Sequence, residues 1–192
     1  MIPPHSYRDD DVFRDEMAKL FHGGYQFVGM ASELANDRDF VCVDYAGASI
    51  VVQNFKGALK AFQNVCSHRF SKIQNEDRGN RLLMCRYHAW TYNEEGVPAG
   101  MPKRQEYVGE DGDISSLCLT SYRVETCGKF VFVCSPDHPG TLRDFLGSFH
   151  DTLEQISQHI GAEFHYGVVP HRANWKILVE NCLLYTSPSP RD

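Results

Sequence analysis

Two short segments, each with one cysteine and one histidine close together, most constrain what this chain can fold into. The first has the spacing C-x-H, with Cys66 and His68, and the second has the spacing C-x-x-H, with Cys85 and His88. Residues 69–84 separate the two pairs. Thiolates combined with neutral imidazoles suit iron–sulfur or zinc chemistry. We therefore expect two loops that bring these four side chains to one metal centre.

Two alternative interpretations of this pattern remain. Structural zinc sites usually take both ligands of a short pair from one residue type. Here each pair mixes Cys with His, which favours iron–sulfur chemistry over zinc. The four residues could also be unrelated core side chains, but both pairs lie in loops that also carry arginine or glycine.

The two segments resemble the ligand loops of a Rieske [2Fe–2S] centre, in which two His replace two Cys on one iron. The likeness includes Arg69 after the first histidine and the sequence Tyr87-His88-Ala89-Trp90 in the second segment. By these residues the chain is similar to the alpha subunits of Rieske non-haem iron oxygenases, the aromatic ring-hydroxylating oxygenases.

This resemblance implies a role for each candidate ligand. Cys66 and Cys85 would hold one iron, which stays ferric, and His68 and His88 would hold the other, which takes the electron. The outward ring edges of the two histidines would form the exit path for electrons. Their N–H protons would couple reduction to pH.

The resemblance also indicates which kind of Rieske centre to expect. High-potential Rieske proteins of respiratory complexes clip their loops with a disulfide, but the corresponding places here hold Ser71 and Tyr87. Those proteins also place a serine hydroxyl near the cluster sulfurs where this chain has Trp90. Fewer hydrogen bonds to sulfur stabilise the reduced cluster less. We therefore expect a midpoint potential toward the low end of the Rieske range of about −150 to +300 mV.

Runs of β-branched and aromatic residues between turn residues predict a mainly β fold, α+β overall. One hairpin is expected from residues 40–45 and 49–54, and another within residues 124–134. Short strands joined by tight turns are typical of a β-sandwich or barrel. The resemblance adds that two loops at one end of such a fold hold the cluster, with turns around Gly79 and Gly96.

Composition shifts and helical spacing divide the chain further. Residues 1–24 are expected to form an N-terminal helical segment, and residues 25–135 the Rieske domain. Residues 136–181 comprise a linker helix at 142–160, a strand at 164–169 and the truncated start of an α+β catalytic domain.

The segment Asn174–Asn181 resembles the opening of the family's catalytic domain. In the family it leads into a helix that bears an acidic residue and two His for non-haem iron, with a further carboxylate later. This chain has Tyr185 and Pro188 where the first of these ligands are expected, so we assign it no catalytic residues. Residues 182–192 read as the in-frame translation of a transposase-type sequencing adapter. We expect the natural part of this sequence to end at Asn181 and residues 182–192 to be read-through. A natural disordered tail is the alternative.

The resemblance implies that the full-length parent is an oxidoreductase. Electrons would come from a ferredoxin or flavin reductase, pass through the [2Fe–2S] cluster, and reach a mononuclear Fe(II) across a subunit boundary in a homotrimer. That iron activates O2 to hydroxylate an aromatic or other organic substrate, as a mono- or dioxygenase. This fragment alone would be inactive. A stand-alone Rieske ferredoxin is the main alternative, and a zinc-stabilised structural module is the third.

The composition of the chain limits its possible binding partners and its cellular compartment. The formal net charge of −6 argues against nucleic-acid binding, and no apolar stretch is long enough to span a bilayer. The N-terminus lacks the basic and apolar regions of a signal peptide. Of the seven cysteines, most of those outside the two pairs sit in apolar runs typical of small buried hydrophobes. We therefore expect a cytoplasmic protein with reduced thiols.

Overall fold

The computed structural model describes residues 2–45, 47–108, 112–161, 163, 167 and 169–186. The chain divides into two compact units. The larger unit comprises residues 17–162, and the smaller one combines residues 1–16 with residues 163–192. Among the described residues, no helix has both the length and the apolar character needed to cross a membrane.

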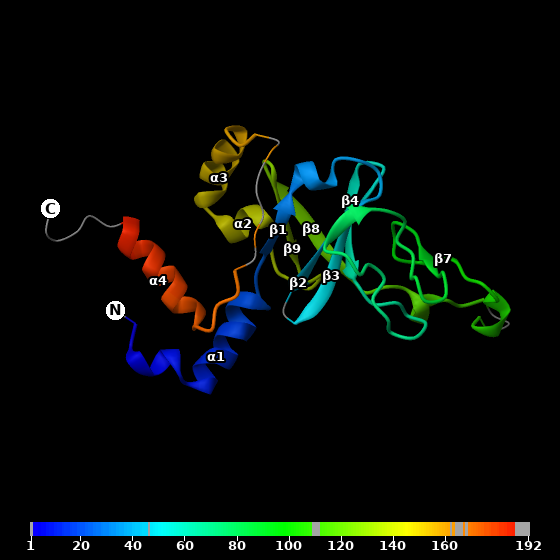
Figure 1. Cartoon of the computed structure of the whole chain (residues 1–192), viewed down its shortest axis with the longest axis horizontal. Helices are drawn as coiled ribbons and strands as arrows, with labels where there is room; N and C mark the ends of the chain where they lie inside the picture. Colours follow the sequence, from blue (N-terminus) through cyan, green and yellow to red (C-terminus); the bar gives the residue numbers. More distant parts are fainter. Residues whose placement is uncertain are drawn as a thin grey trace, which may run out of the picture. The chain divides into compact units, whose positions relative to one another are not determined.

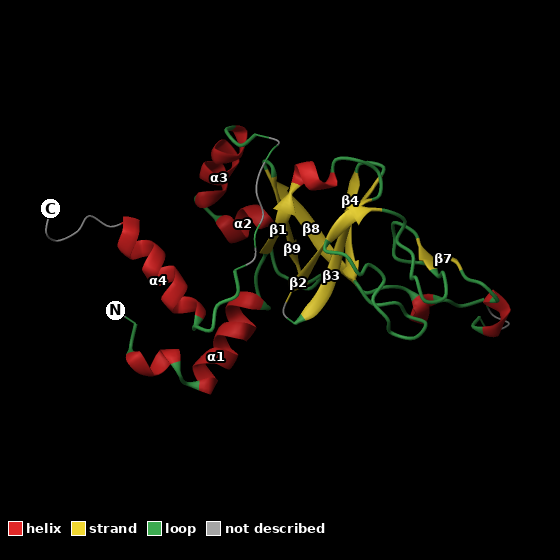
Figure 2. Ribbon diagram, in the orientation of Figure 1, coloured by secondary structure: helices red, strands yellow, loops and turns green. Residues whose placement is uncertain are grey.

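A seven-stranded antiparallel sheet forms the larger unit, with the strand order β1-β9-β8-β4-β3-β2-β5 (Figures 1 and 2). Its strands are β1 (Gln26–Met30), β2 (Asp39–Tyr45), β3 (Ala48–Phe55), β4 (Ala58–Gln63), β5 (Arg78–Asn80), β8 (Ser121–Cys127) and β9 (Phe130–Cys134). The sheet curls into a half-barrel, and both hairpins expected from the sequence are present as β2–β3 and β8–β9. The prediction of a mainly β fold is confirmed.

Strand β3 lies within this sheet, between β4 and β2, and is covered on both faces. Ile50, Val51 and Val52 are all fully buried. Successive side chains of a strand point to opposite faces of the sheet. Ile50 and Val52 therefore pack into a core on one face, whereas Val51 packs into a second core on the other face. This second core also contains Cys66 and Cys85, so the sheet directly supports the two cysteines of interest.

Apart from β5, the residues between β4 and β8 form a loop-rich extension at one end of the sheet (Figure 2). A small hairpin, β6 (Thr91–Tyr92) with β7 (Pro98–Gly100), follows the second Cys–His segment. Two short 3₁₀-helices, Arg104–Glu106 and Ser115–Leu117, complete this region.

The two glycines expected in turns differ. Gly96 has a φ of +75° and closes the turn before β7, as predicted. Gly79 was wrongly assigned to a turn: it lies in β5 opposite Phe40, where a Cβ atom would come within 3.0 Å of the Phe40 ring. Glycine is therefore needed there for close packing and not for a turn.

The expected linker helix is broken into two. Helices α2 (Leu142–Leu146) and α3 (Phe149–Gln158) are separated at Gly147, which has a φ of +54°. The apolar spacing continues through this break, which is why the sequence suggested one helix. The strand expected at 164–169 falls mostly outside the described residues.

The smaller unit contains helices from both ends of the chain. Its helices are a 3₁₀-turn (Pro4–Tyr7), α1 (Asp10–Glu16) and α4 (Trp175–Thr186), and α1 is followed in the larger unit by a π-helical turn (Met17–Phe21). Lys176 Nζ lies 2.7 Å from both carboxylate oxygens of Glu16, and the Trp175 indole N–H also donates to Glu16. The helix expected near the N-terminus is confirmed. Helix α4, however, continues past Asn181 to Thr186, since the first proline comes only at position 188.

Candidate metal centre

Cys66 opens a tight loop that is closed by backbone hydrogen bonds. The Cys66 N–H donates to the carbonyl of Ser71 over 2.9 Å, and the Phe70 N–H donates back to the carbonyl of Cys66 over 2.9 Å. Phe70 has a φ of +56°, a left-handed conformation that bends the chain sharply.

Cys85 opens a second loop with the same backbone design. Its N–H donates to the carbonyl of Trp90 over 2.8 Å, and the Ala89 N–H donates to the carbonyl of Cys85 over 2.9 Å. Ala89 has a φ of +59°. The fourth residue after each cysteine is therefore left-handed, and the fifth accepts the cysteine N–H. Two equivalent loops thus present their side chains in related directions.

The two cysteines are the buried half of the site. Each is only 1% exposed, and both belong to the same core. Burial raises the pKa of Cys66. Burial also opposes ionisation of Cys85, but hydrogen bonds from the Ser71 hydroxyl and from the amides of Tyr87 and His88 outweigh it, so the pKa of Cys85 is lowered. The local dipoles therefore favour a thiolate at Cys85.

The two histidines form the more exposed half. The rings of His68 and His88 meet edge to face, with centroids 4.5 Å apart. His68 also stacks on the indole of Trp90, and the ring of Tyr107 meets it edge-on at 5.0 Å. Burial lowers the pKa of His68, assisted by the charges of His88 and Arg69, which favours the neutral imidazole that a metal requires.

The buried Nδ1 atom of His68 finds no hydrogen-bond partner among the described residues. Buried polar atoms are normally satisfied, and an exception calls for an explanation such as an absent ion or group. The donor set offered here, two thiols and two imidazoles on paired loops, fits an iron–sulfur cluster.

The arrangement does not suit one zinc ion. Four ligands at the usual bond lengths of about 2.0–2.3 Å must lie within roughly 4 Å of one another. Within the described part of the chain, the only group of three or more His, Cys, Asp or Glu ligand atoms that lie within 4.8 Å of one another is His150, Asp151 and Glu154. The cysteine pair and the histidine pair therefore do not converge on a single point. Two separate pairs, one for each metal ion, are what a two-iron centre requires.

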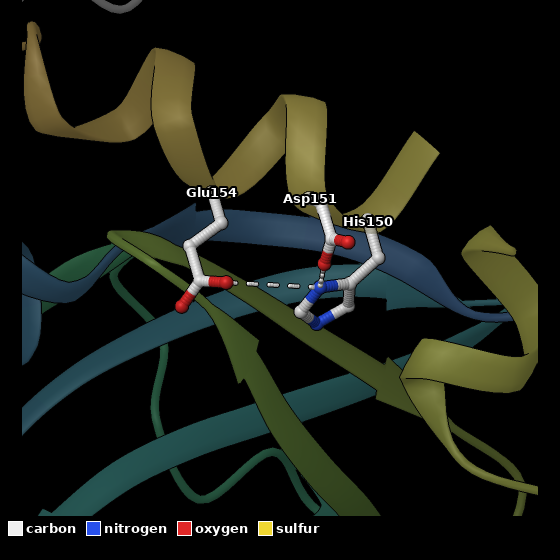
Figure 3. A group of neighbouring side chains, drawn as sticks. All are labelled: His150, Asp151 and Glu154. Carbon is white, nitrogen blue, oxygen red and sulfur yellow. Dashed lines mark ion pairs between the residues drawn. The ribbon is translucent and has the colours of Figure 1, made fainter. Parts of the chain in front are cut away.

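Figure 3 shows this other group, on helix α3. His150 Nδ1 lies 3.4 Å from Asp151 and 3.9 Å from Glu154. Arg143, on α2, pairs with the same two carboxylates at 2.8 Å and 3.9 Å. Because a guanidinium already neutralises the carboxylates, we interpret the group as an ion-pair network that joins α2 to α3. The side chain of His150 is buried.

The sequence-based prediction did not include two hydroxyl groups that lie near the cysteine sulfurs. The Tyr92 hydroxyl lies 3.1 Å from the Cys66 sulfur, and the Ser71 hydroxyl lies 3.2 Å from the Cys85 sulfur. The expectation of fewer hydrogen bonds to the sulfurs therefore overlooked two hydroxyl groups, and the low midpoint potential stays a prediction. Trp90 removes one potential donor, but side chains from elsewhere on the loops supply two others. No signal in the sequence points to them, because these contacts depend on how the two loops pack.

The tips of the two loops carry exposed aromatic and basic side chains. Phe70 is 79% exposed and Tyr87 is 61% exposed. Arg86 pairs with Glu76 over 2.9 Å, and Arg69 is exposed. The flanking arginines are thus surface groups, one of them engaged by a carboxylate.

Comparison with known proteins identifies the family. The model of the Rieske [2Fe–2S] domain matches residues 24–127, more than half of the chain. This chain belongs to the Rieske [2Fe–2S] domain family. All four residues of the two Cys–His segments lie within the matched part of this Rieske chain.

The Rieske chain is similar to oxygenase subunits over most of its length. It is 34% identical over 187 residues to the glycine betaine monooxygenase oxygenase subunit of Chromohalobacter salexigens, covering 94% of this chain and 40% of the relative. It is 29% identical over 179 residues to the large oxygenase component of the naphthalene 1,2-dioxygenase system of Pseudomonas fluorescens, covering 90% of this chain and 40% of the relative. The chain therefore spans about two fifths of the length of these curated relatives.

A solved structure has the same fold. The quaternary ammonium Rieske monooxygenase CntA, in complex with its substrate L-carnitine, matches with a TM-score of 0.81 and 28% identity. The match covers 94% of this chain and 52% of that chain. The resemblance to Rieske oxygenase alpha subunits is confirmed.

Proposed function

We propose that Cys66, His68, Cys85 and His88 hold a Rieske [2Fe–2S] cluster, with the two sulfurs on one iron and the two imidazoles on the other. A cluster bound in this way supplies one-electron transfer. The observation that carries the proposal is the buried Nδ1 of His68, which lacks a hydrogen-bond partner among the described residues and lies in one of two equivalent Cys–His loops.

The protein environment suits this role. The cysteines are buried in the core, which keeps water away from the thiolates. Both histidines are partly exposed at the loop tips, so their ring edges offer a short route for electrons between solvent-side partners and the protein interior. Trp90 fixes the plane of the His68 ring by stacking on it.

For the whole protein we propose an oxygenase that hydroxylates an organic substrate. In support, the similarity to oxygenase subunits continues well beyond the Rieske domain and covers 94% of the chain. A stand-alone Rieske ferredoxin would not need the N-terminal helix or helix α4. We propose a ferredoxin or flavin reductase as electron donor, a trimeric parent, and a mononuclear non-haem iron held outside this chain. The chain alone should then bind a cluster without oxygenating a substrate.

Loading the chain with iron and sulfide under anaerobic conditions tests the assignment. The wild-type chain should develop the visible spectrum of a Rieske centre and undergo reversible reduction. Cys66→Ser and His88→Ala should abolish it, whereas the matched controls Cys118→Ser and His159→Ala should load normally. A wild-type chain that takes up no cluster, or ligand variants that keep it unchanged, would show the assignment to be wrong.

A further inference from the structure

Ser71 occupies a distinctive place in the first loop. It is the fifth residue after Cys66, and its carbonyl accepts the Cys66 N–H. Trp90 holds the equivalent place in the second loop, where its carbonyl accepts the Cys85 N–H. The side chains at these two equivalent positions can therefore be compared directly.

Each of these side chains contacts a residue of the opposite loop. The Trp90 indole, from the second loop, stacks on His68 of the first loop with an interplanar angle of 6°. The Ser71 hydroxyl, from the first loop, lies 3.2 Å from the sulfur of Cys85 in the second. Each loop thus braces a candidate ligand carried by the other, and Ser71 does so through a hydrogen-bonding group.

We propose that Ser71 is a positioning and potential-tuning residue, whose hydroxyl donates a hydrogen bond to the iron-bound sulfur of Cys85. This inference rests on the proposed function. A metal-bound thiolate carries no proton, so the hydroxyl must be the donor. Its hydrogen bond draws negative charge from the sulfur and stabilises the reduced, more negative cluster more than the oxidised one.

The partly buried position of Ser71 strengthens this effect. Its contact with Cys85 lies at the edge of the core that contains both cysteines, where water competes less for the sulfur. Phe70, immediately before Ser71, has a left-handed conformation that turns the chain back, so that the Ser71 carbonyl accepts the Cys66 N–H. Threonine keeps the hydroxyl, whereas alanine removes it with little change in volume.

A redox titration of the loaded 192-residue chain tests the proposal. Ser71→Ala should lower the equilibrium constant for reduction roughly threefold to tenfold, because a hydrogen bond to a charged group is lost. At 59 mV per tenfold change for one electron, the midpoint should fall by about 30–60 mV. Ser71→Thr should stay near wild type. Ser32→Ala, at an exposed serine outside both loops, is the matched control and should not change the midpoint.

A second measurement separates tuning from a purely structural role. The Fe–S(Cys) stretching bands in the resonance Raman spectrum should shift in Ser71→Ala and not in Ser32→Ala, and the wild-type bands should respond to exchange into D2O. A loaded Ser71→Ala chain with an unchanged midpoint and unchanged bands would overturn the proposal for Ser71 alone. A wild-type chain that binds no cluster would overturn the proposed function and this inference together.

Discussion

The indole of Trp90 lies almost parallel to the imidazole of His68, with ring centroids 4.9 Å apart and 6° between the planes. Trp90 is 1% exposed and belongs to the core beneath both loops. The structure adds that the same side chain fixes the orientation of a candidate ligand.

Trp90→Ala should therefore act on both stability and cluster retention. Removing a buried aromatic side chain should lower the free energy of unfolding by about 3–5 kcal/mol. His68 would lose the surface that orients its ring, so the loaded chain should release iron faster. Trp90→Phe keeps a flat ring and should show a smaller effect on both. Urea unfolding and the rate of iron loss to a chelator measure the two effects, and equal iron retention in Trp90→Ala and wild type would contradict the orienting role.

Tyr92→Phe should lower the midpoint potential. Burial raises the pKa of Tyr92, so its hydroxyl stays protonated at neutral pH and can donate to the Cys66 sulfur. The same oxygen accepts the Ser67 N–H over 3.1 Å, so the substitution also leaves that amide without its acceptor. We expect a fall of roughly 30–60 mV and a loss of about 1–2 kcal/mol in stability. A midpoint that rises or stays constant in a redox titration would argue against donation by Tyr92.

Phe70→Gly should stabilise the fold. Phe70 has a left-handed backbone at φ +56° and is 79% exposed, so it carries conformational strain and little burial in this chain. Glycine adopts this conformation freely, and we expect a gain of about 1 kcal/mol. Ala89→Gly, at the equivalent position with φ +59°, is the matched comparison. Thermal unfolding measures both, and a clear loss of stability in Phe70→Gly would show that the phenyl ring makes favourable contacts within the chain.

Acid should weaken the smaller unit through Glu16. Hydrogen bonding to Lys176 lowers the pKa of Glu16 below its ordinary value of 4.5. A carboxyl whose pKa is lower in the folded state stabilises that state above the unfolded pKa, and the contribution is lost as pH falls through the folded pKa. The protection factors of the α4 amides, which correct for the intrinsic pH dependence of amide exchange, should therefore fall below pH 4.5 in wild type. In Glu16→Gln the protection factors should be low already at neutral pH and change less with acid; equal pH dependence of the protection factors in both proteins would rule out this linkage.

The sequence was most informative where a local pattern determines the structure. Runs of β-branched and aromatic residues define β2 and β3, and Gly96 marks a turn in which its φ is positive. The two Cys–His pairs also stand out because mixed ligand spacing is rare outside metal centres. The structure places Cys66 and Cys85 in one core and sets the rings of His68 and His88 edge to face; that the four side chains share one metal centre stays a prediction.

The features of the fold and of the site that the sequence did not reveal depend on contacts between distant segments. The three-residue strand β5 has no pattern of its own and forms by pairing with β2. The directions of the Ser71 and Tyr92 hydroxyls depend on how the two loops pack, so sequence spacing could not assign them to Cys85 and Cys66. The break at Gly147 was hidden because the apolar spacing continues across it.

We propose above all that two sulfurs and two imidazoles of this chain share one two-iron cluster. The most direct measurement is pulsed EPR of the loaded, reduced chain, combined with iron and sulfide analysis. We expect two irons and two sulfides per chain, with magnetic coupling to the nitrogens of two imidazoles, and loss of one nitrogen coupling in His68→Cys. A loaded chain whose signal shows no imidazole nitrogen, or one that retains a single zinc ion and no iron, would contradict it.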